Sequence, residues 1–418
     1  MPHTVRRPVR RRTTPLTLTA LALTALLATG CADGGEDGGA PSAATPSTTP
    51  HGYVEGAKEA AEQQSRLLLG DPGSGASRVL DLITGKVSET ARIPGAVRLG
   101  TDGRFGFFHT DSGTRVLDSG AWMVDHGDHV HYYRAAIRDV GDLPSAKAAE
   151  VRSDATVTAV TDADGHTELY DRTQLEKGKV KKVRALSATH TGAVVPYEEH
   201  LVALTGDEDR AKVTVYDRQG RTVASPDAEC ERPRGDAVTR RGVVLGCADG
   251  ALLVDTDDGK FTAERIPYGE DVPEPEQAPA FRHRAGSDTL TAPAGDRAVW
   301  VLDVTERSWT RVGTGPVLAA NTAGEGSPLL VLETDGALHG YDITTGEQVS
   351  TTKSLVTGGD RTASDGGTGP AVEVDRSRAY VNDPAGKRVY EIDYNDSLRI
   401  ARTFDLDIEP GLMAETGR

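Results

Sequence analysis

The chain has 418 residues and carries 47 lysines and arginines against 63 aspartates and glutamates, a formal net charge of −16. So large an acidic excess repels the phosphates of nucleic acids, and it argues against a protein that binds DNA or RNA. It suits a soluble protein outside the cytoplasm, and it can raise the local concentration of cations.

The first thirty residues have the pattern of an export signal, which we assign to residues 1–30. Five arginines within residues 6–12 precede an apolar run over residues 16–28, and this run is too short for a comfortable transmembrane helix. The run ends in Leu-Ala-Thr-Gly-Cys at residues 27–31, which resembles a bacterial lipobox. The pattern predicts lipidation of Cys31 and an extracytoplasmic protein anchored to the cell membrane. Ordinary signal cleavage beside an incidental cysteine is the alternative.

Two further segments precede the expected folded domain. Residues 31–52 consist mainly of Gly, Ala, Ser, Thr, Pro and Asp, which bury too little apolar surface to fold and are typical of a flexible tether. Residues 53–75 contain the one clear helical pattern of the chain, over residues 55–69, and predict a short helical lead-in.

A loose repeat runs through residues 76–418. Its unit is a short apolar strand that ends in aspartate, followed by a polar turn and another alternating strand. The units lie about 45 residues apart, which is the spacing of β-propeller blades. We therefore predict an all-β fold with a single β-propeller of eight four-stranded blades, or seven if the terminal strands share a blade. The aspartates of the repeat, which we expect only to cap turns, are Asp81, Asp118, Asp171, Asp217, Asp255, Asp303, Asp342 and Asp393.

Cys230 and Cys247 are the only cysteines after Cys31. In an exported protein an isolated pair is most simply a disulfide. Two thiols without nearby histidines would make a poor zinc site, so we predict that the two are bonded to each other.

The segment 125–133, Asp-His-Gly-Asp-His-Val-His-Tyr-Tyr, places three of the eleven histidines and two aspartates within seven residues. On a β-strand His129 and His131 would point to the same face, about 6–7 Å apart at the backbone, which is near enough to bind one ion. His126 lies on the approach to that strand and can supply a third nitrogen. Zinc prefers four ligands, and copper and nickel also take imidazoles. A polar hairpin whose histidines hydrogen-bond locally is the alternative.

The fourth ligand is left open by the residues alone. It can be Asp125, Asp128 or a residue from a distant blade. His190 comes just before the start of an expected strand and is the candidate for such a long-range ligand, with a structural role in a loop as the alternative.

The chain resembles the AztD-type zinc metallochaperones, which are extracytoplasmic β-propeller proteins, over most of residues 75–418. The resemblance rests on the histidine-rich segment 125–133, on His-Thr-Gly-Ala-Val-Val-Pro at 190–196, and on Cys230 with Gly-Cys-Ala-Asp-Gly at 246–250. The end of the chain, from Tyr-Val-Asn-Asp-Pro at 380–384 onward, also fits.

Two positions depart from the family pattern. Thr191 stands where the family has the second of two adjacent histidines, and Arg234 stands where it has a histidine after the first cysteine. The tether at residues 31–52 also lacks a histidine-rich arm, since His51 is its only histidine. A second zinc site of the family type is therefore not expected.

The resemblance implies zinc as the metal, bound by His126, His129 and His131 with His190 as the favoured addition. It implies a metallochaperone without catalytic activity that delivers zinc to the solute-binding protein of an ABC zinc importer, and we expect a monomer. Two other classes are open: a metal-dependent propeller enzyme of the lactonase or hydrolase kind, and a propeller scaffold for protein contacts. No segment resembles a nucleophile elbow or a quinone-cofactor pocket, which disfavours the enzyme.

Overall fold

The computed structural model describes residues 53–126, 129–144, 150–357 and 367–418, and nearly all of its regular structure is β. These residues belong to the compact unit of residues 50–418. The predicted signal peptide, the lipidated Cys31 and the tether all lie outside the described residues. No helix in the described ranges is long and apolar enough to cross a membrane.

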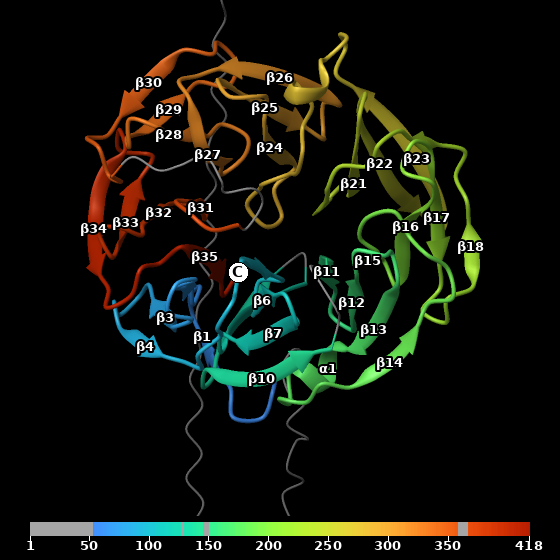
Figure 1. The fold of residues 1–418 in the computed structure, drawn as a ribbon, viewed down its shortest axis with the longest axis horizontal. Helices are drawn as coiled ribbons and strands as arrows, with labels where there is room; N and C mark the ends of the chain where they lie inside the picture. Colours follow the sequence, from blue (N-terminus) through green and yellow to red (C-terminus); the bar gives the residue numbers. More distant parts are fainter. Residues whose placement is uncertain (1–52, 127–128, 145–149, 358–366) are drawn as a thin grey trace, which may run out of the picture. The chain divides into compact units, whose positions relative to one another are not determined.

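Eight antiparallel sheets follow one another along this unit and form the blades of a propeller (Figure 1). Blade 1 has β2 (Arg66–Gly70), β3 (Ser77–Asp81), β4 (Val87–Glu89) and the C-terminal β35 (Leu412–Thr416). Blade 2 has β5 (Arg98–Thr101), β6 (Phe105–Thr110), β7 (Gly113–Asp118) and β10 (Arg138–Leu143). Blade 3 has β11 (Glu150–Ser153), β12 (Val157–Thr161), β13 (Thr167–Asp171) and β14 (Lys182–Ala185). Blade 4 has β15 (Val195–Tyr197), β16 (His200–Gly206), β17 (Ala211–Tyr216) and β18 (Thr222–Ala224), with β19 (Glu229–Cys230) beside β17.

The remaining four blades continue the same order. Blade 5 has β20 (Asp236–Thr239), β21 (Gly242–Cys247), β22 (Gly250–Asp257) and β23 (Lys260–Pro267). Blade 6 has β24 (Thr289–Pro293), β25 (Ala298–Asp303) and β26 (Ser308–Gly313), and an isolated bridge between Arg282 and Thr291 takes the place of a fourth strand. Blade 7 has β27 (Val317–Thr322), β28 (Leu329–Glu333), β29 (Leu338–Tyr341) and β30 (Gln348–Thr351). Blade 8 has β31 (Val372–Val374), β32 (Ala379–Asp383), β33 (Arg388–Asp393) and β34 (Arg399–Asp405).

A ninth sheet of three strands stands beside the blades. It contains β1 (Lys58–Ala60), β8 (Ala121–Asp125) and β9 (Val130–Arg134), in the order β1-β9-β8. The helices of the described residues are two single turns, α1 (Arg172–Leu175) and the 3-10 turn η1 (Glu274–Glu276). The prediction of an all-β propeller with eight blades is therefore confirmed.

The predicted helical lead-in over residues 53–75 is wrong. The residues 67–69, Leu-Leu-Leu, lie in β2, which pairs with β3 on one side and with β35 on the other. All three leucines are fully buried. Because β35 comes from the other end of the chain, its pairing with β2 completes blade 1 and overrides the local helical preference of this segment.

The core lies between neighbouring blades and is built from Val, Leu, Ala and aromatic side chains. One buried cluster joins Phe107 of blade 2 to Val160 and Tyr170 of blade 3, and another joins Val244 of blade 5 to Trp300 of blade 6. Each blade therefore buries its faces only against its neighbours, which is why a ring of blades is the smallest stable unit.

The aspartates of the repeat act as turn caps, as expected from sequence. Asp81 accepts a hydrogen bond from the Thr84 backbone N–H at 2.9 Å, and Asp342 accepts from the N–H of Thr345 at 2.8 Å. Asp171 instead caps α1, where it accepts from the N–H of Thr173.

Cys230 and Cys247 are bonded in a disulfide that links β19 of blade 4 to β21 of blade 5. Both cysteines are buried. The bond confirms the predicted pairing, and it fits a location outside the cytoplasm.

The disulfide gives a first prediction on stability. Replacing both Cys230 and Cys247 with serine removes a cross-link between positions 17 residues apart. The unfolded chain then gains entropy, so we expect the free energy of unfolding to fall by about 3 kcal/mol in urea titrations. Reduction of the unmodified protein should give a similar loss, whereas an unchanged midpoint in both experiments would contradict the prediction.

Candidate metal centre

The histidine-rich segment forms a hairpin that is inserted into blade 2. Strands β8 and β9 lie in the chain between β7 and β10, which are themselves paired in blade 2. The hairpin therefore belongs to the second repeat, as expected, but its strands are not blade strands. They pair with each other and with β1, and so build the separate three-stranded sheet.

Strand register brings the histidines to one face of this sheet. Val124 of β8 is directly opposite His131 of β9, and the backbone N–H of His126 donates to the carbonyl of His129 at 2.9 Å. Opposite residues of an antiparallel pair share a face, and residues two apart on one strand also share a face. His126, His129 and His131 therefore all lie on the same side of the sheet. Their ring centroids are 4.8–5.4 Å apart.

The three imidazoles can bind one metal ion. One nitrogen from each ring can be chosen so that all three lie within 4.8 Å of one another. In a tetrahedral zinc site with bonds of about 2.1 Å, ligand atoms are about 3.4 Å apart, so small side-chain rotations are sufficient to close the set around an ion. His126 and His129 are exposed and His131 is half-buried, so an ion bound here would be open to solvent.

Glu59 adds a carboxylate that sequence reasoning missed. It lies on β1 opposite Tyr133, and its Oε1 is 2.6 Å from Nδ1 of His131. A carboxylate that accepts from Nδ1 fixes the tautomer and leaves Nε2 for a metal. Nothing near Glu59 in the sequence signals this role, because the contact depends on the pairing of β1 with β9.

Two of the other predicted ligands are not brought to the cluster. Asp125 is opposite Val130, so alternation places it on the face away from the histidines. His190 lies between blades 3 and 4, where its Nδ1 is 3.0 Å from the Thr167 hydroxyl and its ring contacts Tyr216 edge-on. Burial lowers the pKa of His190, as is usual for a packed structural imidazole. Asp128 lies outside the described residues.

The two positions that depart from the family pattern have structural contacts. The hydroxyl of Thr191 donates to the carbonyl of Gly206 at 3.1 Å, and Arg234 pairs with Glu274 at 3.1 Å. Threonine and arginine side chains are not among the ligands that zinc prefers, so these two positions do not supply the ligands that the family pattern has there.

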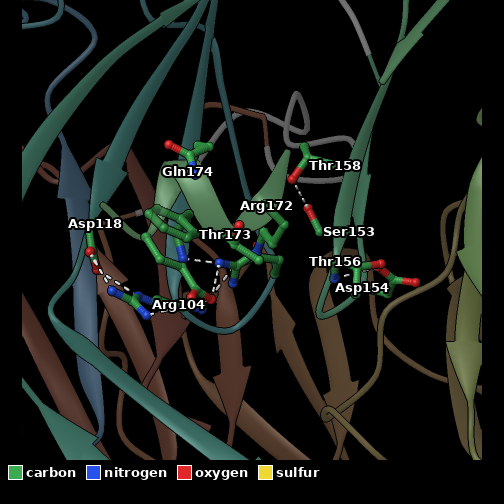
Figure 2. Close-up of polar contacts among 12 residues, drawn as sticks. Arg104, Asp118, Ser153, Asp154, Thr156, Thr158, Arg172, Thr173 and Gln174 are labelled. Atoms are coloured by element: carbon green, nitrogen blue, oxygen red, sulfur yellow. Dashed lines mark hydrogen bonds and ion pairs between the residues drawn. The ribbon is translucent and has the colours of Figure 1, made fainter. Parts of the chain in front are cut away.

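The buried guanidinium of Arg104 packs against the base of the hairpin. Tyr133 stacks on Trp122 with ring centroids 5.4 Å apart, and the Arg104 guanidinium lies 3.7 Å from the centroid of the Trp122 ring. Figure 2 shows Arg104 pointing at Asp118, to which it donates two hydrogen bonds of 3.1 and 2.9 Å. Because Tyr133 also stacks on His131, this chain of contacts fixes the ring that Glu59 orients.

The adjacent blade supports this base. Arg172, the first residue of α1, donates to Asp102 at 2.9 Å and to Glu176 at 2.9 Å, and its guanidinium lies 4.3 Å from the centroid of the Phe105 ring. Figure 2 shows Arg172 near Arg104. The base of the hairpin therefore packs against a network of buried ion pairs.

Comparison with known proteins relates the chain to solved structures only. No family model matches it, and no curated protein matches it in sequence. Two structures of AztD from Citrobacter koseri, one of them the apo form, superpose with TM-scores of 0.71 and 0.70 at 20% and 19% identity. Each comparison covers 85% of this chain and 98% of AztD.

A second kind of protein is similar at a lower level. The dihydro-heme d1 dehydrogenase NirN, in complex with DHE, has a TM-score of 0.51 at 15% identity, covering 84% of this chain and 75% of NirN. AztD therefore matches better in both score and coverage. On this geometry and these comparisons, the chain is an AztD-like protein in its fold.

Proposed function

We propose that this protein binds zinc at His126, His129 and His131 and delivers it to the solute-binding protein of an ABC zinc importer. The observation that carries the proposal is the convergence of three imidazoles within 4.8 Å on one face of a hairpin, with Glu59 hydrogen-bonded to one of them. The AztD-like fold supports it, since the same arrangement of blades occurs in that protein.

The exposure of the cluster suits transfer. Three imidazoles leave one coordination position of a tetrahedral ion for water, for Asp128 or for a ligand of the acceptor. Because His126 and His129 are exposed, an acceptor can replace them one at a time while the oriented His131 still holds the ion. The net charge of −16 would guide an acceptor whose docking surface is basic.

The location that we propose completes this role. Export and lipidation at Cys31 would tether the propeller to the membrane surface, where the importer also lies. The buried disulfide between Cys230 and Cys247 supports an oxidising compartment.

A transfer experiment tests the proposal. The purified protein, loaded with zinc, is mixed with the metal-free solute-binding protein of a zinc importer, or with a small chelator of matched affinity. We expect the protein acceptor to take the zinc faster than the chelator does, because ligand exchange within a complex avoids free zinc. Equal rates with both acceptors would overturn delivery while leaving zinc binding intact.

A metal-dependent hydrolase is the second candidate, because an open coordination position can also activate a water molecule. Zinc-loaded protein should then hydrolyse lactones or phosphoesters, and the activity should disappear with the metal. Absence of turnover across both substrate classes would favour the chaperone.

The contact between Glu59 and His131 gives a prediction on affinity. In Glu59→Gln the charge that orients His131 is lost while the shape of the side chain is kept, so we expect zinc affinity to fall by about 10- to 100-fold. The measurement is a competition titration against a chromophoric chelator. Glu62→Gln, which changes an exposed glutamate in the same segment, is the matched control and should leave the affinity unchanged. Equal affinities for the two variants would show that Glu59 does not act on the site.

A further inference from the structure

A second group of metal-ligand side chains lies in blade 7. Strands β28 and β29 are adjacent in Figure 1, and their hairpin contains Glu333, Asp335 and His339. One ligand atom from each of the three residues can be chosen so that all lie within 4.8 Å of one another. This group shares neither a residue nor a sheet with the histidine cluster.

Each of the three side chains is oriented by a residue outside the group. Oε1 of Glu333 accepts from the Tyr341 hydroxyl at 2.5 Å and from the Gly315 N–H at 3.0 Å, which leaves Oε2 on the side of His339. Nδ1 of His339 is 3.2 Å from Oε1 of Gln348, so its Nε2 faces the carboxylates. Contacts of this kind hold ligands in place around a metal.

Asp335 is held by its own turn and opens the group to solvent. Its Oδ1 accepts from the Ala337 backbone N–H at 2.9 Å. Its side chain is 57% exposed, whereas those of Glu333 and His339 are 8% and 11% exposed. Two buried ligands and one exposed ligand leave a route by which an ion can enter.

The distances within the group match a coordination shell. Nε2 of His339 is 3.1 Å from Oδ2 of Asp335 and 3.7 Å from Oε2 of Glu333. These values bracket the separation of about 3.4 Å between ligand atoms of a tetrahedral zinc ion. The second distance is too long for a direct hydrogen bond, so Oε2 of Glu333 is not bonded to the imidazole.

We propose that Glu333, Asp335 and His339 form a second site for a divalent transition-metal ion such as Zn²⁺, with water in the fourth position. One imidazole and two carboxylates suit zinc and similar ions, and the two negative charges balance the ion. The site goes beyond the proposed function and does not depend on it.

Gly315 provides a probe that leaves all three ligands in place. A Cβ at this position would lie 1.7 Å from Oε2 of Glu333, so Gly315→Ala must displace the carboxylate from the site. Gly313, two residues earlier, has open space within 4 Å of the corresponding position, and Gly313→Ala is the matched control.

The experiment measures zinc in a protein that lacks the first cluster. The full chain carrying His129→Ala and His131→Ala is stripped of metal and titrated with Zn²⁺ by calorimetry, and with Co²⁺ by visible absorption. We expect one ion still to bind per chain. Adding His339→Ala or Gly315→Ala should weaken this binding about 10- to 100-fold, and Gly313→Ala should not change it.

Two outcomes would overturn the proposal. The first is that the background variant binds no metal, and the second is that His339→Ala and Gly315→Ala leave its binding unchanged. Asp335→Asn is the variant least expected to disturb folding, so it separates loss of a ligand from loss of the fold. Its amide oxygen can still accept from the Ala337 N–H, while the charge is lost. A folded Asp335→Asn protein must also bind zinc more weakly. These results are independent of whether zinc is delivered to an importer.

Discussion

A protein carrying both His129→Ala and His131→Ala is expected to lose high-affinity zinc binding at the hairpin, with a fall of roughly 1,000-fold or more. Four-ligand structural zinc sites have apparent binding free energies of about 10–16 kcal/mol, so two imidazoles account for about half of that energy. His126 would be left as the only histidine of the cluster. Because the removed side chains are exposed or half-buried, the fold should be unaffected.

The measurement separates this site from the one proposed in blade 7. Zinc titrations of the unmodified protein should show two ions, and those of the double variant should show one. His166→Ala is the matched control, since it removes an exposed histidine from the turn between β12 and β13. A double variant that binds two ions with unchanged affinity would exclude the histidine cluster as a metal centre.

The sequence predicted the propeller because its signal is local and repeated. Each blade carries a strand, a turn aspartate such as Asp81 or Asp342, and a return strand within a few residues, and the same turn chemistry appears in the structure. The prediction of a helix over residues 55–69 was wrong for the opposite reason. Whether residues 67–69 form a helix or a strand is decided by pairing with β35, which local propensity cannot show.

The candidate metal centre was predictable only where it depends on local alternation. His129 and His131 share a face on any strand, so their convergence could be read from sequence. The position of Asp125 could also have been predicted from the sequence. A hairpin that pairs His126 with His129 places Asp125 opposite Val130, on the other face of the sheet. The role of Glu59 could not be predicted from the sequence, because its distance from His131 depends on how β1 pairs with β9.

The largest effect on stability is expected from Arg104→Met, which should lower the free energy of unfolding by about 3–5 kcal/mol. The side chains of Arg104 and Asp118 are 3% and 0% exposed. Removing the guanidinium leaves a buried carboxylate that keeps a hydrogen bond from the Gly120 N–H at 2.9 Å and a weaker interaction with the charge of Arg66, and burial of a poorly compensated charge is costly. Urea titrations with a common slope give the difference.

A second substitution shows whether the buried charge is the cause. Adding Asp118→Asn to Arg104→Met removes the charge but keeps an oxygen that can accept from Gly120, so most of the lost stability should return. If Arg104→Met costs less than about 1 kcal/mol, the pair behaves like an exposed ion pair and the argument from burial is wrong.

The charge-neutral double variant also isolates the contact with Trp122. Its zinc affinity should stay below that of the unmodified protein, because the ring on which Tyr133 stacks has lost the cation that holds it.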